Sequence, residues 1–256
     1  RWLLSKVTFK TFEYELRGLD PNPSQRILNE RSGQPLGYTT RADTLRRLRQ
    51  MFHWAFHNGY TEGINYASWV PSTTGAAPTR QPASLYQLEK LHNAIELADW
   101  PERAAAAIVL MYDVGLRRCE CVALRIEQIQ IFADGSGLLN VTGKRTKANP
   151  TGKRQCAFDA PVGIVLRSYL DGLLCTHGAL FRHVRDTDRP LGAKGLYYEV
   201  KKVIRLAGLA DVLQGCHDGR RNYVTHMLGQ NPRNPVFADV IRRNLGHASF
   251  AQTAGY

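Results

Sequence analysis

Residues 128–160 read QIQIFADGSGLLNVTGKRTKANPTGKRQCAFDA, and they interrupt a chain whose apolar residues otherwise recur at helical spacing. The runs IQIF, LLNVTG and QCAFDA are short, apolar or alternating, and bounded by turn residues, so we predict three strands. Asp134-Gly135, between the first two runs, is typical of a hairpin turn. A small antiparallel sheet inside a helical chain indicates a mainly α fold of the α+β class.

Helices are predicted on both sides of this sheet. Ser84 followed by Gln87 is a capping-box pattern, and Gly59 stands where a helix cap belongs. The segment 102–114 is almost entirely apolar and is expected to be a buried helix. The predicted helices cover residues 40–58, 84–95, 102–114, 116–127, 161–174, 194–207, 217–229 and 236–245.

A stretch rich in Pro, Ser, Thr and Gly, PSTTGAAPTRQPA at residues 71–83, divides the chain. It has no apolar periodicity, which is typical of a linker between domains. We therefore expect a small helical domain over 1–75, a linker over 76–83 and a larger mixed domain over 84–256. Because the chain begins with Arg1 rather than Met, we also expect the first domain to lack its N-terminus.

The composition indicates a polyanionic partner. Lys and Arg total 34 against 22 Asp and Glu, a formal net charge of +12. An excess of this size is typical of proteins that bind nucleic acid. No apolar run reaches the ~18 residues that a membrane span needs, so no membrane partner is expected. The candidate DNA contacts are Arg46, Arg47 and Arg49 on the polar side of the first predicted helix, and Lys153.

The five cysteines form no disulfide framework. Their number is odd, and the two that stand one residue apart fall in a predicted helix, where their side chains face different directions, which argues against a zinc site. We expect all five to be reduced core residues of a cytoplasmic, nucleoid-associated protein without metal or cofactor. They are Cys119, Cys121, Cys156, Cys175 and Cys216.

Two pairs of residues suggest a site for one phosphodiester. Arg117 follows a Gly-Leu dipeptide at a predicted helix start, with Glu120 one turn later, positioned to pair with it. His217 and Arg220 stand three residues apart and share a helix face. Arginine suits such a site because its planar fork binds phosphate bidentately and keeps its charge.

Two further residues complete the pattern. A Leu-Gly-His motif ending at His247 predicts a helix that ends at a glycine cap and is followed by an exposed imidazole. Tyr256 follows nine residues later, whereas Tyr223, the nearest rival tyrosine, is expected to pack in the core. In this order the motifs resemble the active site of the tyrosine recombinases, the integrase family of DNA-breaking and rejoining enzymes. The family's catalytic lysine lies on a β-hairpin between the two arginines, where the predicted sheet falls.

The resemblance implies a clamp on DNA, made of a helical core-binding domain and an integrase-like catalytic domain. It implies that the phenol of Tyr256 attacks the scissile phosphate, giving a 3′-phosphotyrosine and a free 5′-hydroxyl without metal or ATP. Arg117 and Arg220 would hold the phosphate oxygens. His247 would add a hydrogen bond as charge develops, and His217 would assist proton movement at the tyrosine.

The hairpin lysine would protonate the departing 5′-oxygen. Lys144 is favoured because it follows Gly143 at the end of the second predicted strand, where several family members place this lysine. Lys147 is the alternative, and Lys153 is a more distant candidate. The chain departs from the family at Gly219, where a leucine is usual, and we expect the glycine to loosen that helix turn.

The partners implied by the resemblance are double-stranded DNA with a specific recombination site and, on that DNA, a homotetramer. Integration, excision or resolution of a mobile element would be the purpose. Family members usually continue past the tyrosine into a helix that docks on a neighbour, so this chain, which stops at Tyr256, is expected to be monomeric without DNA. Two alternatives remain open: DNA relaxation of the type IB topoisomerase kind, and a non-catalytic DNA-binding relative.

Overall fold

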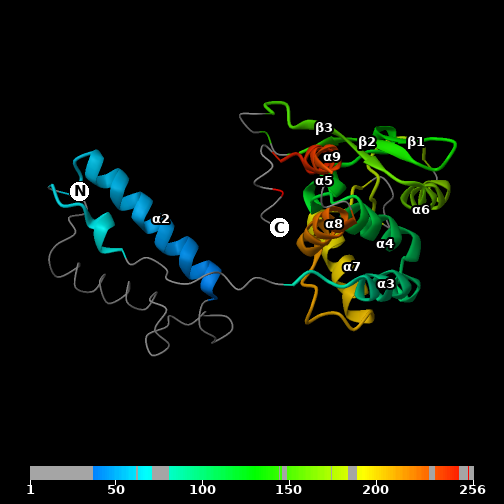
Figure 1. Cartoon of the computed structure of the whole chain (residues 1–256), viewed down its shortest axis with the longest axis horizontal. Helices are drawn as coiled ribbons and strands as arrows, with labels where there is room; N and C mark the ends of the chain where they lie inside the picture. The colour runs from blue at the N-terminus through cyan, green and yellow to red at the C-terminus, as the bar shows by residue number, and fades with distance from the viewer. Residues whose placement is uncertain are drawn as a thin grey trace. The chain divides into compact units, whose positions relative to one another are not determined.

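The chain divides into two compact units, between Arg80 and Gln81, and this division falls inside the stretch predicted as a linker (Figure 1). Residues 71–80, which hold most of that stretch, lie outside the described residues. The computed structural model describes residues 37–61, 63–70, 81–143, 145, 149–173, 175–183, 189–230, 234–247 and 253.

The described part of the first unit is built on one long helix, α2 (Tyr38–His57). Gly59 follows the helix with φ +72°, which confirms the predicted cap. The apolar side of α2 packs against the short 3₁₀ helix η2 (Tyr66–Trp69). The buried residues of this small core are Leu45, Phe52, Ala67 and Val70.

The second unit contains the predicted sheet. Its strands β1 (Ile129–Ile131), β2 (Gly137–Thr142) and β3 (Lys153–Phe158) pair antiparallel in that order, which confirms the three strands and the fold class. Gly135 adopts φ +88° in the turn between β1 and β2, as the Asp-Gly pattern predicts. Figure 1 shows the sheet on one side of the helices, with α9 beside β3.

A buried helical segment forms the centre of this unit. It consists of α4 (Pro101–Ile108) and one π-helical turn, η4 (Val109–Asp113), and helix α8 (Cys216–Gln230) packs across that turn. The predicted buried helix is therefore confirmed, although its last turn is wider than an α-helix. The remaining helices are α3 (Leu85–Asn93), η3 (Ala94–Leu97), α5 (Arg118–Ala123), η5 (Ile126–Gln128), α6 (Ala160–Asp171), α7 (Ala193–Leu206) and α9 (Pro235–Leu245).

The helix predicted over 116–127 is wrong in length. Helix α5 ends at Ala123, and Leu124 is extended, with φ −68° and ψ +137°. The carbonyl of Leu124 accepts a hydrogen bond from the amide of Leu180 at 2.9 Å, and Arg125 pairs with Ala179. This pairing with a distant segment ends the helix early, because the same main-chain groups cannot serve both structures.

The prediction that all five cysteines are core residues is wrong for two of them. Cys119 is exposed and Cys175 is half-buried, whereas the other three are buried. Cys119 and Cys121 face different sides of α5, and only the second side faces the core. Among the described residues, no group of His, Cys, Asp or Glu is arranged to hold a metal ion. None of the described helices is both long enough and apolar enough to cross a membrane.

Candidate active site

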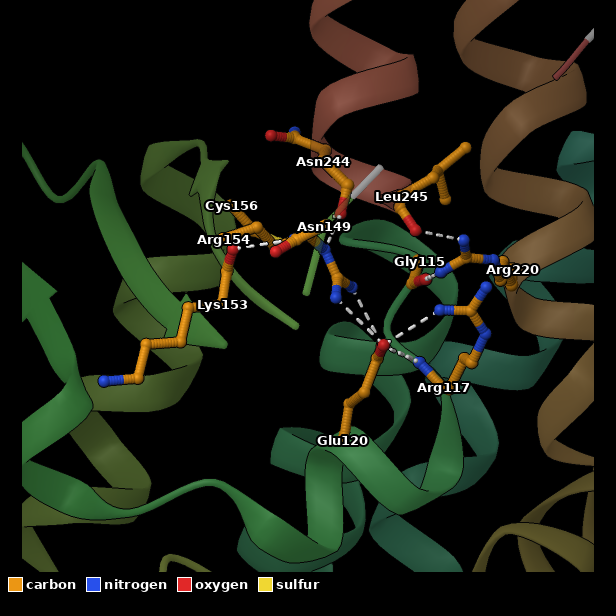
Figure 2. Close-up of polar contacts among 10 residues, drawn as sticks. All are labelled: Gly115, Arg117, Glu120, Asn149, Lys153, Arg154, Cys156, Arg220, Asn244 and Leu245. Atoms are coloured by element: carbon orange, nitrogen blue, oxygen red, sulfur yellow. Dashed lines mark hydrogen bonds and ion pairs between the residues drawn. The ribbon is translucent and has the colours of Figure 1, made fainter. Parts of the chain in front are cut away.

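Arg220 is the centre of the candidate site. It lies in the second turn of α8 and is 0% exposed. Its Nη1 donates to the carbonyl of Gly115 at 3.0 Å, and its Nη2 donates to the carbonyl of Leu245 (Figure 2). Gly115 presents its carbonyl from a backbone with φ +77°, a conformation that favours glycine. Arg220 therefore joins the segment before α5 to the end of α9, and carbonyl oxygens accept these bonds without cancelling the charge of the guanidinium.

Gly219 allows α8 to approach η4 closely, next to the position from which Arg220 makes these hydrogen bonds. A Cβ atom at this position would lie 2.7 Å from the carbonyl oxygen of Met111 and 2.8 Å from the ring of Tyr112, both in η4. Helix α8 runs unbroken through Gly219, contrary to the loosening expected from sequence. The departure from the family leucine thus serves close packing of two helices.

Arg117 and Glu120 form the predicted pair. Arg117 is the N-cap of α5, and its amide donates to Glu120 Oε2 at 2.8 Å. Its Nη1 donates to Oε1 of the same carboxylate at 2.9 Å. Glu120 is only 2% exposed, and the guanidinium of Arg117 is partly open to solvent. The carboxylate therefore fixes the orientation of an arginine that solvent can still reach.

Arg154 is the site residue that the sequence interpretation missed. From β3 it donates two hydrogen bonds to Glu120, Nη1 to Oε1 and Nη2 to Oε2, each at 2.9 Å, and Nε donates to the carbonyl of Asn244 at 2.7 Å. Figure 2 shows its guanidinium meeting the same carboxylate as Arg117. The sequence held one indication of this role. Arg154 stands at every-second-residue spacing with Cys156 and Phe158, which are buried, so all three lie on the same face of the strand.

His247 is buried, so the prediction of an exposed imidazole is wrong. Gly246 turns the chain with φ +65°, and the amide of His247 bonds back to the carbonyl of Arg242 at 3.1 Å. The residue is 7% exposed, and its Nδ1 lies 2.9 Å from Oγ1 of Thr253, which is also buried. Thr253 thus covers a side chain that the local helix end alone would leave in solvent.

The site is strongly cationic. Burial lowers the pKa of His247 to about 4, and nearby positive charges add to this effect, so the imidazole is neutral at pH 7. Glu120 has a lowered pKa, since its arginine partners outweigh the opposing effect of burial, and it stays ionised. Among the charges that lower the pKa of His247 are those of Arg220, Arg117, Arg154 and Arg242.

The other predicted catalytic residues fall in two groups. His217 is exposed in the first turn of α8, and Lys153 is exposed at the start of β3. The remaining three lie outside the described residues, and their roles stay predictions. They are Lys144, Lys147 and Tyr256.

The predicted DNA contacts on α2 differ among themselves. Arg46 and Arg47 are exposed, and both pair with Asp43 on the same helix. Arg49 is partly buried, and its Nη2 donates to the carbonyl of Val70 at 2.9 Å. Arg46 and Arg47 therefore keep the solvent access that a phosphate contact needs, whereas Arg49 also serves the packing of its own unit.

The geometry defines a class of protein: an α+β unit with guanidinium groups gathered around a neutral imidazole, suited to an anionic ligand. Residues 84–256 match the model of the Phage integrase family. This match covers more than half of the chain, and the chain belongs to that family.

The relatives are tyrosine recombinases. Tyrosine recombinase XerC of Lacticaseibacillus casei is 29% identical over 163 residues, which are 60% of this chain and 50% of the relative. Tyrosine recombinase XerD of Pasteurella multocida is 25% identical over 254 residues, 94% of this chain and 78% of the relative. The chain thus spans about half the length of the XerC relative.

Solved structures show the same fold. The XerH site-specific recombinase bound to its difH substrate is similar with a TM-score of 0.60 and 19% identity, over 86% of this chain and 62% of that one. The Tn1549 transposon integrase in complex with transposon right-end DNA gives a TM-score of 0.65 and 16% identity, over 86% and 75%. At these identities the likeness concerns the fold.

Proposed function

We propose that this protein is a site-specific tyrosine recombinase that cleaves and rejoins double-stranded DNA through a 3′-phosphotyrosine. The observation that carries the proposal is the convergence of Arg220, Arg117 and His247, from three separate motifs, on one cationic site. Membership of the phage integrase family and similarity to recombinases support the same reaction. The reaction would serve integration, excision or resolution of a mobile element.

Each residue of the cluster has a role in this proposal. Arg220 and Arg117 bind the non-bridging oxygens of the scissile phosphate and offset the charge that grows on them during attack. His247 is neutral, so its one N–H can donate to an oxygen without adding a further positive charge. His217, exposed on the same helix as Arg220, assists proton movement at the phenol of Tyr256.

The general acid is Lys144 in this proposal, with Lys147 as the alternative. The support comes from Gly143, the residue directly before Lys144. A Cβ atom at Gly143 would lie 2.6 Å from Oε1 of Glu120, so the main chain passes directly against the carboxylate that orients Arg117. Lys153, which is exposed on β3, is assigned a contact to a DNA phosphate instead.

Two strand exchanges between two duplexes need four active sites, so the proposed active species is a homotetramer on DNA that carries a specific site. We place it in the cytoplasm, on the nucleoid. The relatives are recombinases by name, which favours recombination over both supercoil relaxation and DNA binding without catalysis. A plasmid relaxation assay separates the first two activities, because relaxation requires no specific site.

The decisive test uses the nucleophile. Footprinting on DNA that flanks the gene identifies the core site, and a nicked suicide substrate built on that site traps the covalent adduct. Tyr256→Phe should abolish the adduct and leave DNA affinity within about twofold, because affinity rests on phosphate contacts elsewhere.

Tyr223→Phe is the matched control. Tyr223 is buried, as predicted, and its hydroxyl accepts a hydrogen bond from Asn244 at 3.3 Å, so this variant should still form the adduct. An adduct that persists in Tyr256→Phe would contradict the assignment. Peptide mapping of that adduct would then identify the residue that attacks.

A further inference from the structure

We propose, resting on the proposed function, that Arg154 is a positioning residue for strand cleavage. It acts through Glu120 on Arg117, and through the end of α9 on the turn that carries His247. Three segments far apart in sequence meet at its guanidinium: the start of α5, the strand β3 and the end of α9.

The first contact is a shared carboxylate. Oε1 of Glu120 accepts hydrogen bonds from Nη1 of both Arg117 and Arg154, each at 2.9 Å. Oε2 accepts from the amide of Arg117 at 2.8 Å and from Nη2 of Arg154 at 2.9 Å. Each oxygen therefore bridges the two arginines, and the bidentate fork of Arg154 fixes the plane of the carboxylate to which Arg117 is held.

The second contact reaches the end of α9. Nε of Arg154 donates to the carbonyl of Asn244, whose neighbour Leu245 accepts the hydrogen bond from Arg220. The stem of Arg154 also packs against Gly246, where a Cβ atom would lie 3.0 Å from its Cδ. One side chain thus sets the distance between Arg117 and the turn that leads into His247.

Arg154 itself is not placed to bind DNA. Its side chain is 9% exposed, and all three of its nitrogens donate to protein acceptors. Lysine cannot replace it fully, because an ammonium has no planar fork and cannot bind both carboxylate oxygens and the Asn244 carbonyl together. A role through its neighbours, rather than on the phosphate, is the one that this geometry allows.

Loss of Arg154 has a consequence that can be measured by titration. Burial by itself would raise the pKa of Glu120, but the hydrogen bonds and charge of Arg154, followed by those of Arg117, hold this pKa below its ordinary value. Among the described residues, the thiols of Cys121 and Cys156 also interact electrostatically with this carboxylate. Without Arg154 the pKa of Glu120 rises, and its protonation at acidic pH releases Arg117.

The experiment measures single-turnover capture of the nicked suicide substrate by the full chain, from pH 5.5 to pH 8, together with DNA affinity. Arg154→Met should slow capture about 10²-fold, since small displacements of catalytic groups cost about that much, and should leave affinity within about threefold. Its rate should fall more steeply towards the acidic end of this range than that of the wild type, because Glu120 loses the interactions that lower its pKa. Arg154→Lys should be slowed about tenfold, and it provides the same test if the methionine variant does not fold.

Arg103→Met is the matched control. Arg103 is equally buried, pairs with Glu199 across α4 and α7, and donates to the carbonyl of Arg182, and neither partner belongs to the candidate site. It should lower thermal stability and leave the capture rate and its pH profile as in the wild type. Addition of Glu120→Gln to Arg154→Met should slow capture much less than it does in the wild type, because both changes break one unit.

Two results would overturn the proposal. Capture by Arg154→Met at the wild-type rate is one. Equal slowing in Arg154→Met and Arg103→Met, with an unchanged pH profile, is another, because it would indicate only a general loss of stability. A wild-type chain that traps no DNA would instead overturn the proposed function, on which the role of Arg154 rests.

Discussion

His247 shows how burial can define the chemistry of a single residue. Its imidazole is neutral because burial and four arginines oppose protonation, and its Nδ1 is engaged with the hydroxyl of Thr253. A neutral imidazole next to guanidinium groups can donate a hydrogen bond to an anion, but it has no additional proton to release. The residue that follows the glycine cap is therefore suited to stabilise developing negative charge rather than to act as a general acid.

The neutral state of His247 has a predicted effect on stability. Its pKa is about 4 in the folded protein against an ordinary value of 6.5, so between these values the unfolded chain binds the additional proton and stability rises with pH. At pH 7, His247→Gln should be about 1–3 kcal/mol less stable than the wild type, because the buried hydrogen bond is disturbed. As pH falls from 6.5 towards 4, this difference should shrink, which urea unfolding at stepped pH would measure.

The difference in free energy of unfolding between the wild type and His247→Gln is more informative than either value alone, because another titratable group acts in the opposite sense. Burial and the charge of Asp159 raise the pKa of Asp113 to about 7, so this carboxyl favours the folded state at low pH and loses that effect as pH rises through 7. Asp113 is common to both proteins and cancels in the comparison. A stability difference that stays constant from pH 7 to pH 4.5 would show that His247 is not held neutral.

The crossing of α8 over η4 positions Arg220. We expect Gly219→Ala to destabilise the second unit by about 1–3 kcal/mol, because the new methyl group meets the carbonyl of Met111 at 2.7 Å. This loss should exceed the gain of roughly 1 kcal/mol that alanine brings to a helix. Chemical unfolding measures the change.

Gly229→Ala on the same helix is its control. Nothing lies within 4 Å of a Cβ atom at that position, so the helix gain should appear alone, up to about 1 kcal/mol. If both alanine variants proved equally stabilising, close packing at Gly219 would not be the reason for the glycine.

Elements determined by local patterns were predictable from sequence. The alternation in LLNVTG gives β2, and the Ser84–Gln87 capping box is present, with hydrogen bonds of 3.2 and 2.9 Å. The three-residue spacing of Arg117 and Glu120 likewise indicated that these two residues pair at the start of α5. These features depend on residues a few positions apart, where the spacing alone determines which side chains are in contact.

Features determined by distant contacts were not predictable in this way. Helix α5 ends early because Leu124 pairs with Leu180, and Arg154 meets Glu120 across 34 positions of the chain. His247 is covered by Thr253, a buried residue six positions further along the chain. Each depends on where the tertiary fold brings a second segment, which local periodicity does not encode.

The two units have separate cores and share a basic charge. The core of the second unit begins at Ala83, whose amide donates to Asn222 at 2.6 Å and whose carbonyl contacts His226 at 2.8 Å, both on α8. The first unit contributes a long helix with exposed arginines. With a net charge of +12, both units are expected to contribute to DNA affinity through phosphate contacts.

We therefore predict that residues 81–256 fold alone, with an unfolding midpoint within a few degrees of that of the same unit in the full chain. Their DNA affinity should be lower and should depend less steeply on salt, because the phosphate contacts of α2 are absent. Fluorescence anisotropy of labelled duplex at several salt concentrations measures both quantities.

Arg46→Ala with Arg47→Ala in the full chain should reduce the salt slope by about 1–2. If the isolated unit matched the full chain in affinity and slope, then the first unit would make no phosphate contact, and its basic face would be an ordinary solvated helix surface.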